Sequence, residues 1–166
     1  MLISVSSATG PDCRSTALLT AGSDRSNRSI TVTVKAGSIE GTIVVPVDGT
    51  TLSVAGSTSL LVGASTTFAV SLKDSSGNPI AAQQIAVTSA LGNAVTPAQA
   101  ATDNTGATSF NYVATRSGAD VITVTGAGVV QTLAVNVSSI NFAFTAPAAS
   151  TEVTVNVAAP VTVRYL

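Results

Sequence analysis

The stretch Phe68-Ala69-Val70-Ser71-Leu72, followed by Ser75-Ser76-Gly77-Asn78-Pro79, decides the fold class. Its apolar side chains alternate with small or polar ones. Successive side chains of a β-strand point to opposite faces, so the alternation predicts a strand with one buried and one exposed face. The Gly-Asn-Pro run predicts a tight loop that ends this strand and leads the chain into another.

The same period-two pattern continues along most of the chain. Ala-rich residues 94–101 are the nearest candidate for a helix, but Pro97 interrupts them. Short strands, glycine-rich turns and no helical stripe predict an all-β, immunoglobulin-like antiparallel β-sandwich with Phe68, Phe110 and Tyr112 in its core. The further alternating apolar positions are Ile85, Val87, Ile122, Val124, Leu133, Val135 and Val137.

The composition argues against several classes of function. Of the 166 residues, 45% are hydrophobic and only 9% are charged. The sequence has no histidine, which removes a Ser-His-Asp arrangement and histidine zinc sites, and a net charge of −1 offers no basic patch for nucleic acid. Cys13 is alone, and the apolar runs are shorter than the ~18 residues of a membrane helix. We therefore expect no enzyme, no cofactor, no nucleic-acid partner and no membrane insertion.

Segments of the chain recur at a period of about 90 residues, close to the size of one immunoglobulin-like sandwich. Ile30-Thr31-Val32-Thr33 returns as Ile122-Thr123-Val124-Thr125, and residues 161–165 resemble residues 68–72. This pattern predicts three parts. Residues 1–48 are the C-terminal half of one repeat, residues 49–137 a complete domain, and residues 138–166 the first strands of a following repeat.

Each partial domain would expose an apolar face and unpaired strand edges. One hypothesis is that the C-terminal strands of one chain complete the N-terminal half of another, giving a homo-oligomer by head-to-tail strand exchange. The alternative is that the halves pack on the central domain or on crystal neighbours because of where the chain is cut. Phe142 and Phe144 are the residues we predict for contact with another chain.

Two motifs in the central repeat carry a resemblance. They are Lys73-Asp74-Ser75-Ser76-Gly77-Asn78-Pro79-Ile80 and Thr102-Asp103-Asn104-Thr105-Gly106-Ala107-Thr108, and Gly118 follows before an Ile-Thr-Val-Thr strand. With this order and spacing, the repeat resembles bacterial immunoglobulin-like domains of the invasin/intimin type (bacterial Ig-like group 1). In the N-terminal half the second motif is degraded, because Asp12 is present but Arg14 or Ser15 stands where glycine would be.

The resemblance implies a non-enzymatic module of a bacterial cell-surface adhesin, in which tandem repeats form a stalk and contact neighbouring repeats. The first residues lack the basic region of a signal peptide, so the chain is either intracellular or an excerpt from a longer exported protein. The partial repeats at both ends favour the excerpt, and we therefore expect an extracellular fragment of a larger exported protein. Two alternatives stay open. The chain could be an adhesion module that binds a host protein or glycan through sandwich-end loops, or a self-assembling fibre subunit joined by strand exchange.

The site residues that we predict are structural turn residues. Aspartate accepts hydrogen bonds from nearby backbone N–H groups, and glycine supplies positive φ angles. Calcium binding is the alternative, but the eight acidic residues are scattered, so we predict no metal site. Asn27-Arg28-Ser29 and Asn136-Val137-Ser138 match a glycosylation pattern and are assigned no role. The predicted turn residues are Asp74, Gly77, Asn78, Pro79, Thr102, Asp103, Gly106 and Gly118.

Overall fold

The computed structural model describes residues 2–5, 8–139, 142–146, 152 and 154–165. Within these residues every regular element is a β-strand and none is a helix. Branched and aromatic side chains suit the pleated surface of such strands. In chain order the strands are β1 (Leu2–Val5), β2 (Ala17–Leu19), β3 (Arg28–Ala36), β4 (Ile39–Val47), β5 (Thr51–Ala55), β6 (Ser59–Leu61), β7 (Ser65–Lys73), β8 (Gln84–Ser89), β9 (Ala94–Thr96), β10 (Gln99–Ala101), β11 (Ala107–Val113), β12 (Gly118–Gly126), β13 (Val129–Ser138), β14 (Phe142–Ala146) and β15 (Thr162–Tyr165).

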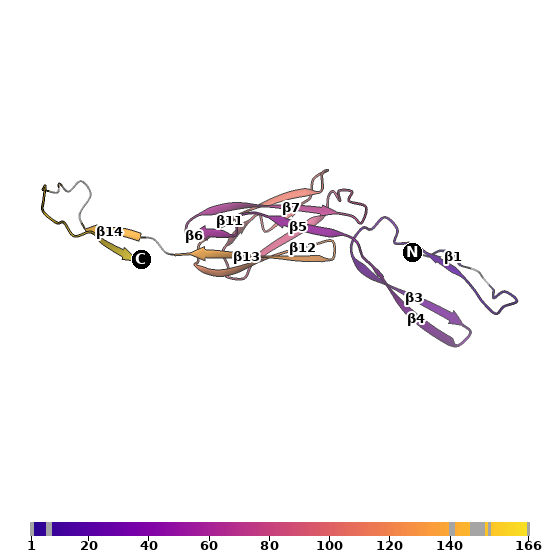
Figure 1. Ribbon diagram of the computed structural model, residues 1–166. Coiled ribbons are helices and arrows are strands. Elements are labelled where there is room, and N and C mark those ends of the chain that lie inside the picture. The colour runs from indigo at the N-terminus through magenta and orange to yellow at the C-terminus, as the bar shows by residue number, and fades with distance from the viewer. Residues whose placement is uncertain (1, 6–7, 140–141, 147–151, 153, 166) are drawn as a thin grey trace.

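Strands β5 to β13 form two sheets that pack into a sandwich in the middle of the molecule (Figure 1). One sheet has the order β10-β8-β12-β13-β6, and the other has the order β5-β7-β11-β9. Neighbouring strands in both sheets are antiparallel, except that β6 runs parallel to β13. The predicted all-β, immunoglobulin-like sandwich is confirmed, with one parallel pair at the edge of the larger sheet.

The alternating apolar positions fill the space between the two sheets. Phe68, Phe110 and Tyr112 have no exposed surface, which confirms the predicted core. The rings of Phe68 and Tyr112 meet edge to face with their centroids 5.5 Å apart, a geometry that aromatic pairs favour. The other buried apolar residues are Leu52, Val70, Leu72, Ile80, Ile85, Val87, Ala114, Ile122, Val124, Ala127, Val135 and Val137.

The Ala-rich stretch forms strands rather than a helix, as the proline indicates. Residues 94–96 are β9, which pairs with β11, and residues 99–101 are β10, which pairs with β8. These partners lie in different sheets. The chain therefore crosses from one sheet of the sandwich to the other at Pro97, where a proline costs no hydrogen bond of a central strand.

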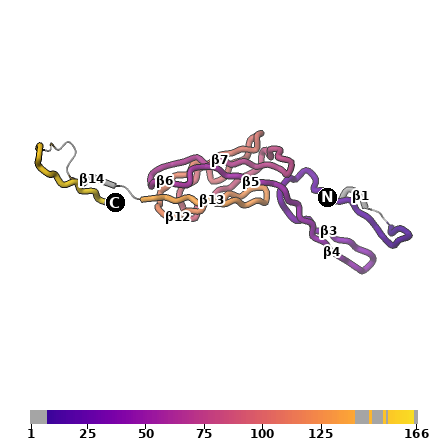
Figure 2. Tube along the Cα trace, in the orientation of Figure 1, coloured from indigo at the N-terminus to yellow at the C-terminus, as the bar shows by residue number. Residues whose placement is uncertain are grey.

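Further hairpins extend from the two ends of the sandwich (Figures 1 and 2). Strands β1 and β2 pair with each other, and β3 pairs with β4, on the N-terminal side. The β14–β15 hairpin lies beyond the opposite end. The division into residues 1–48, 49–137 and 138–166 stays a prediction.

The hairpin turns correct one detail of the repeat. Ala36 pairs with Ile39 across the β3–β4 turn, as Gly126 pairs with Val129 across the β12–β13 turn. Counted from these turns, Val32 rather than Ile30 takes the position of Ile122. The turn sets the register of a hairpin. Relative to their turns, the two matching Ile-Thr-Val-Thr segments are offset by two residues, so their side chains still point to the same face.

Candidate functional site

The Asp74 turn joins β7 to the segment that leads into β8. The Asp74 carboxylate accepts hydrogen bonds from the backbone N–H groups of Ser76 and Asn78, both at 2.9 Å. The side chain of Asn78 donates to the same carboxylate at 3.4 Å, and Gly77 has a φ of 80°. Pro79 lies opposite Lys73 in an isolated bridge that closes the loop. These are the contacts of a self-capped turn.

The Asp103 turn, which precedes β11, has the same construction. Its carboxylate accepts bonds from the N–H and hydroxyl groups of Thr105, at 2.8 and 2.7 Å, and from the N–H of Ala107 at 3.0 Å. Gly106 has a φ of 72°, and its carbonyl accepts a bond from the N–H of Leu72 at 2.9 Å. The second turn therefore packs against the start of the first.

Hydrogen bonding also determines the acidity of both turn carboxylates. The N–H of Asn78 contributes most to lowering the pKa of Asp74, partly offset by desolvation and helped by Ser76 and Arg25. The Thr105 hydroxyl contributes most to lowering the pKa of Asp103, followed by the N–H of Ala107. Both groups are thus carboxylates at neutral pH, already engaged by their own turns.

Thr102 occupies a close-packed position beside these turns, whereas Gly118 lies at the opposite end of the sandwich, where β11 connects to β12. The Thr102 side chain is buried, donates to the carbonyl of Ile80 at 2.7 Å and accepts from the N–H of Gln83 at 3.0 Å. Gly118 begins β12 with a φ of 130°, and a Cβ there would lie 3.3 Å from a methyl group of Leu91. Thr102 therefore ties the segment between β7 and β8 to the start of the Asp103 turn.

A third turn of the same type lies in the N-terminal part, but its alignment differs from the sequence prediction. The N–H of Gly10 donates to the carbonyl of Arg14, and the N–H of Cys13 donates to the carbonyl of Gly10. Asp103, Gly106 and Ala107 make the equivalent pair of bonds. Cys13, with a φ of 59°, therefore takes the glycine position, and Gly10 rather than Asp12 takes the aspartate position.

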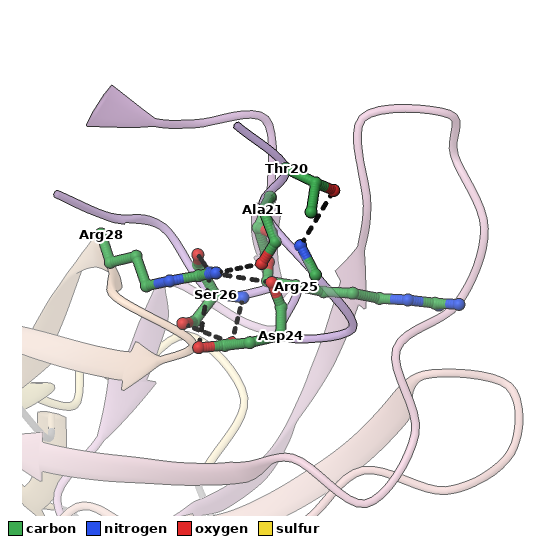
Figure 3. Close-up of polar contacts among 8 residues, drawn as sticks. Thr20, Ala21, Asp24, Arg25, Ser26 and Arg28 are labelled. Atoms are coloured by element: carbon green, nitrogen blue, oxygen red, sulfur yellow. Dashed lines mark hydrogen bonds and ion pairs between the residues drawn. The ribbon is translucent and has the colours of Figure 1, made fainter. Parts of the chain in front are cut away.

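The loop before β3 is organised around the guanidinium group of Arg28 (Figure 3). This group donates to the carbonyls of Ala21, Asp24 and Ser26, and it lies 3.4 Å from the Asp24 carboxylate. Asp24 also accepts bonds from the N–H and hydroxyl of Ser26. Figure 3 shows the side chain of Arg25 pointing away from this cluster. The loop thus has a defined shape and presents Arg25 outward.

This loop meets the sandwich at a contact that we call the joint. The joint comprises residues 24–28, the linker 48–50 between β4 and β5, and two turns of the sandwich, 74–79 and 126–128. Sequence reasoning missed it, because its residues come from four separate segments. Asn27 was visible only as part of a glycosylation pattern, and its side-chain amide is occupied by bonds to Thr50.

A buried polar cluster inside the sandwich was also missed. The Asp120 carboxylate is 1% exposed and receives bonds from Ser89, Asn93 and Tyr112 and from the N–H of Leu91. Burial alone would raise the pKa of Asp120, but these donors together lower it to about 2. The sequence offered one signal that Asp120 is buried. Its period-two spacing from Ile122 and Val124 places all three side chains on the same face of the strand.

Neither cluster forms a metal site in the part of the chain that the structure describes. A hollow of about 210 Å³ at the joint is lined by Asp24, Asp48 and Asp74 among others. Among the described residues, however, no group of three acidic or cysteine side chains could hold a metal ion. No helix of the described chain is long and apolar enough to cross a membrane.

The predicted interchain contact cannot be placed. The backbones of Phe142 and Phe144 pair with Tyr165 and Val163 in the β14–β15 hairpin. Their side chains lie outside the described part of the structure. A contact through these two rings stays a prediction.

No protein-family description matches the sequence, and no curated protein sequence matches it. Among solved structures, a C-terminal 282-residue fragment of intimin, in complex with the intimin-binding domain of its receptor Tir, is 16% identical with a TM-score of 0.45, over 54% of this chain and 32% of that one. Domains 4–9 of the surface layer protein SbsC are 19% identical with a TM-score of 0.46, over 95% of this chain and 30% of that one.

The adhesin InvE of Yersinia pseudotuberculosis is 13% identical with a TM-score of 0.48, over 82% of this chain and 46% of that one. The chain thus spans less than half the length of each of these three structures. At these scores the likeness carries no argument about function. The fold assignment rests on the strand order and pairing of the sandwich itself.

Proposed function

We propose that this chain is a non-catalytic stalk segment of a bacterial cell-surface adhesin of the invasin/intimin type. The observation that carries the proposal is the recurrence of strand pairing on the N-terminal side of the sandwich. The β3–β4 hairpin has the turn register of β12–β13, and the Gly10–Arg14 turn has the bonds of the Asp103 turn. Consecutive copies of one fold in a line are the architecture of a spacer.

The use of the polar groups supports a structural role. The carboxylates of Asp74 and Asp103 cap their own turns, and Asp120 is enclosed by donors. A general acid or base needs an accessible group whose pKa lies near the working pH, and the pKa of each of these three is lowered. The sequence supplies no histidine that could act instead.

The composition supports an extracellular location. Only 9% of the residues are charged, and exposed strand positions carry serine and threonine, such as Ser53, Ser109 and Thr31. One cysteine in 166 residues leaves the fold independent of internal disulfides. Together with the resemblance of the two turn motifs, this supports a surface segment between neighbouring repeats.

A surface-display fusion tests the spacer function. The chain is inserted between an outer-membrane anchor and an epitope tag, and the height of the tag above the membrane is measured optically. The sandwich should raise the tag by roughly 30–40 Å, from about 3.3 Å per strand residue. A flexible Gly/Ser insert of equal residue number is the matched control, and it should give a broad distribution of tag heights because its ends move freely. The folded chain should give a narrow one, and a distribution as broad as that of the control would contradict the proposal.

Binding assays on the purified chain separate a spacer from an adhesion module. A spacer gives no saturable binding to host cells or to a glycan array. Saturable binding that is lost when residues 75–79 or 103–106 are changed would instead identify a recognition module at this end of the sandwich.

The uncovered β3–β4 hairpin favours a second candidate, a fibre subunit. Ile30 faces Val45, and Val32 faces Ile43, on one side of the hairpin. Ile43 is 61% exposed, whereas Leu133, which takes the same position in the sandwich, is partly buried against the core. A second copy could cover this face by strand exchange. Light scattering after size exclusion tests it, and a monomer at every micromolar concentration would contradict the fibre.

A further inference from the structure

We infer that the end of the sandwich formed by turns 74–79 and 126–128 is a docking surface for the segment that precedes it. We infer also that Asn27 holds this segment in a single orientation relative to the sandwich. The inference deepens the proposed spacer function. The purpose of the joint rests on that proposed function, but its fixed orientation does not. A row of repeats keeps its length if its joints do not bend.

Asn27 connects three segments that are distant in the sequence. Its side-chain oxygen accepts from the N–H of Thr50 at 3.0 Å, and its side-chain nitrogen donates to the carbonyl of Thr50 at 3.2 Å. Its own N–H donates to the carbonyl of Ala127 at 2.9 Å. The amide thus pairs with both backbone groups of the linker residue while the backbone of Asn27 bonds to the sandwich. An aspartate would keep the shape but lose the donor.

The sandwich makes room for this contact with a glycine. Gly128 has a φ of 72°, and a Cβ on it would collide with the carbonyl oxygen of Asn27. Gly37 lies in the corresponding turn of the β3–β4 hairpin with a φ of 62°, and a Cβ there would meet nothing within 4 Å. Both turns need a residue that tolerates positive φ, but only Gly128 is needed for a close approach.

The linker is held against the other turn. A Cβ on Gly49 would lie 2.7 Å from the Cβ of Ser75, so the chain passes directly over the Asp74 turn. Thr50 is 7% exposed, and its hydroxyl donates to the carbonyl of Arg25. Of the three residues between β4 and β5, Gly49 and Thr50 are therefore packed against neighbouring segments and do not form an open hinge.

Arg25 adds a charged contact at the edge of the joint. Its guanidinium donates to the carbonyl of Pro79 at 3.2 Å and lies 3.7 Å from the Asp74 carboxylate. The Arg25 side chain is 53% exposed, so this pair contributes little by itself and is weakened by salt. The direction of the joint is set chiefly by the Asn27, Thr50 and Gly128 contacts.

The test measures the distance between two spin labels across the joint. Cys13 is changed to serine, and cysteines for labelling replace the exposed residues Ser38 in the β3–β4 turn and Ser109 in β11. The inference predicts one narrow distance distribution. Asn27→Asp, Asn27→Ala and Gly128→Ala should each replace this single narrow peak with a broad one. Gly63→Ala, at a positive-φ position where a Cβ meets nothing within 4 Å, and Asn136→Ala both lie outside the joint and should leave the peak unchanged.

The outcomes are separable from those of the display assay. A broad distribution in the unaltered joint would overturn the inference. So would a narrow peak that survives Asn27→Asp and Gly128→Ala while near-ultraviolet circular dichroism shows a folded sandwich. The isosteric Asn27→Asp change keeps the test decisive if Gly128→Ala fails to fold. A narrow peak combined with no gain in tag height would refute the spacer function and leave the joint intact.

Discussion

The hydroxyl of Tyr112 donates a hydrogen bond of 2.9 Å to the carboxylate of Asp120 in the interior of the sandwich. The same carboxylate oxygen receives Ser89 at 2.6 Å and Asn93 at 2.8 Å. Its other oxygen receives the N–H of Leu91 at 3.0 Å. A buried charge without a cation is costly unless donors replace the lost water, and here four donors do so.

This cluster makes stability depend on acid. Burial acts to raise the pKa of Asp120, but the four hydrogen bonds outweigh it and bring the pKa from 3.8 to about 2. The folded state therefore holds the proton less tightly than the unfolded state. The stabilisation is complete above pH 4 and is lost as pH falls towards 2, by about 2 kcal/mol. Urea unfolding at a series of pH values measures it.

The variant Asp120→Asn isolates the contribution of this residue. Asp24, Asp74 and Asp103 also have lowered pKa values, so the unaltered protein has additional acid dependence. The stability of Asp120→Asn should fall less steeply between pH 4 and pH 2. Parallel curves for the two proteins would show that Asp120 is not the responsible group.

Tyr112 should titrate at unusually high pH. Burial raises the pKa of its hydroxyl to about 12, helped by the hydrogen bond to Asp120 and by the charge of Asp120. The folded state thus holds this proton more tightly than the unfolded state. The resulting stabilisation is complete below pH 10 and is lost as pH rises towards 12. Tyrosinate absorbance in a Tyr165→Phe variant follows Tyr112 alone, and titration near pH 10 in a folded protein would contradict the cluster.

Two glycines with similar backbone angles should respond differently to alanine. Gly77 and Gly106 have φ angles of 80° and 72°, so Ala at either site costs about 1 kcal/mol of conformational energy. A Cβ at Gly77 meets nothing within 4 Å, but at Gly106 it would lie 2.5 Å from the carbonyl oxygen of Leu72. Gly106→Ala should lose roughly 1–3 kcal/mol more than Gly77→Ala. Equal urea midpoints would show that the two turns are not closely packed.

Local patterns were sufficient to predict the sandwich core. The alternation of Phe68, Val70 and Leu72 determines which side chains share a face, and all three are buried. The Asp74 turn depends on atoms within a few residues of each other. Such features can be predicted because the interacting groups are neighbours in the sequence.

The joint and the buried cluster could not be predicted in this way. The spacing places Asp120 on the core face of its strand, but its donors Ser89, Leu91 and Asn93 come from another part of the sandwich and cannot be identified from that spacing. The partners of Asn27 are fixed by the path of the linker and by the β12–β13 turn. The offset between the Ile30 and Ile122 segments could not be predicted either. The turn sets the register of a hairpin, and the recurring side chains do not.

Thr102 offers a test of the predicted turn motif that separates its hydroxyl from its shape. The buried hydroxyl donates to the Ile80 carbonyl at 2.7 Å and accepts from the Gln83 N–H at 3.0 Å. Thr102→Val keeps the volume and removes both bonds, so it should cost about 1–3 kcal/mol of unfolding free energy. Thr102→Ser keeps the hydroxyl and loses one methyl group, at about 0.8 kcal/mol. Denaturant unfolding compares the two. If the valine variant proved as stable as the unaltered protein, the hydroxyl would contribute nothing to stability and Thr102 would act only as a filler of the core.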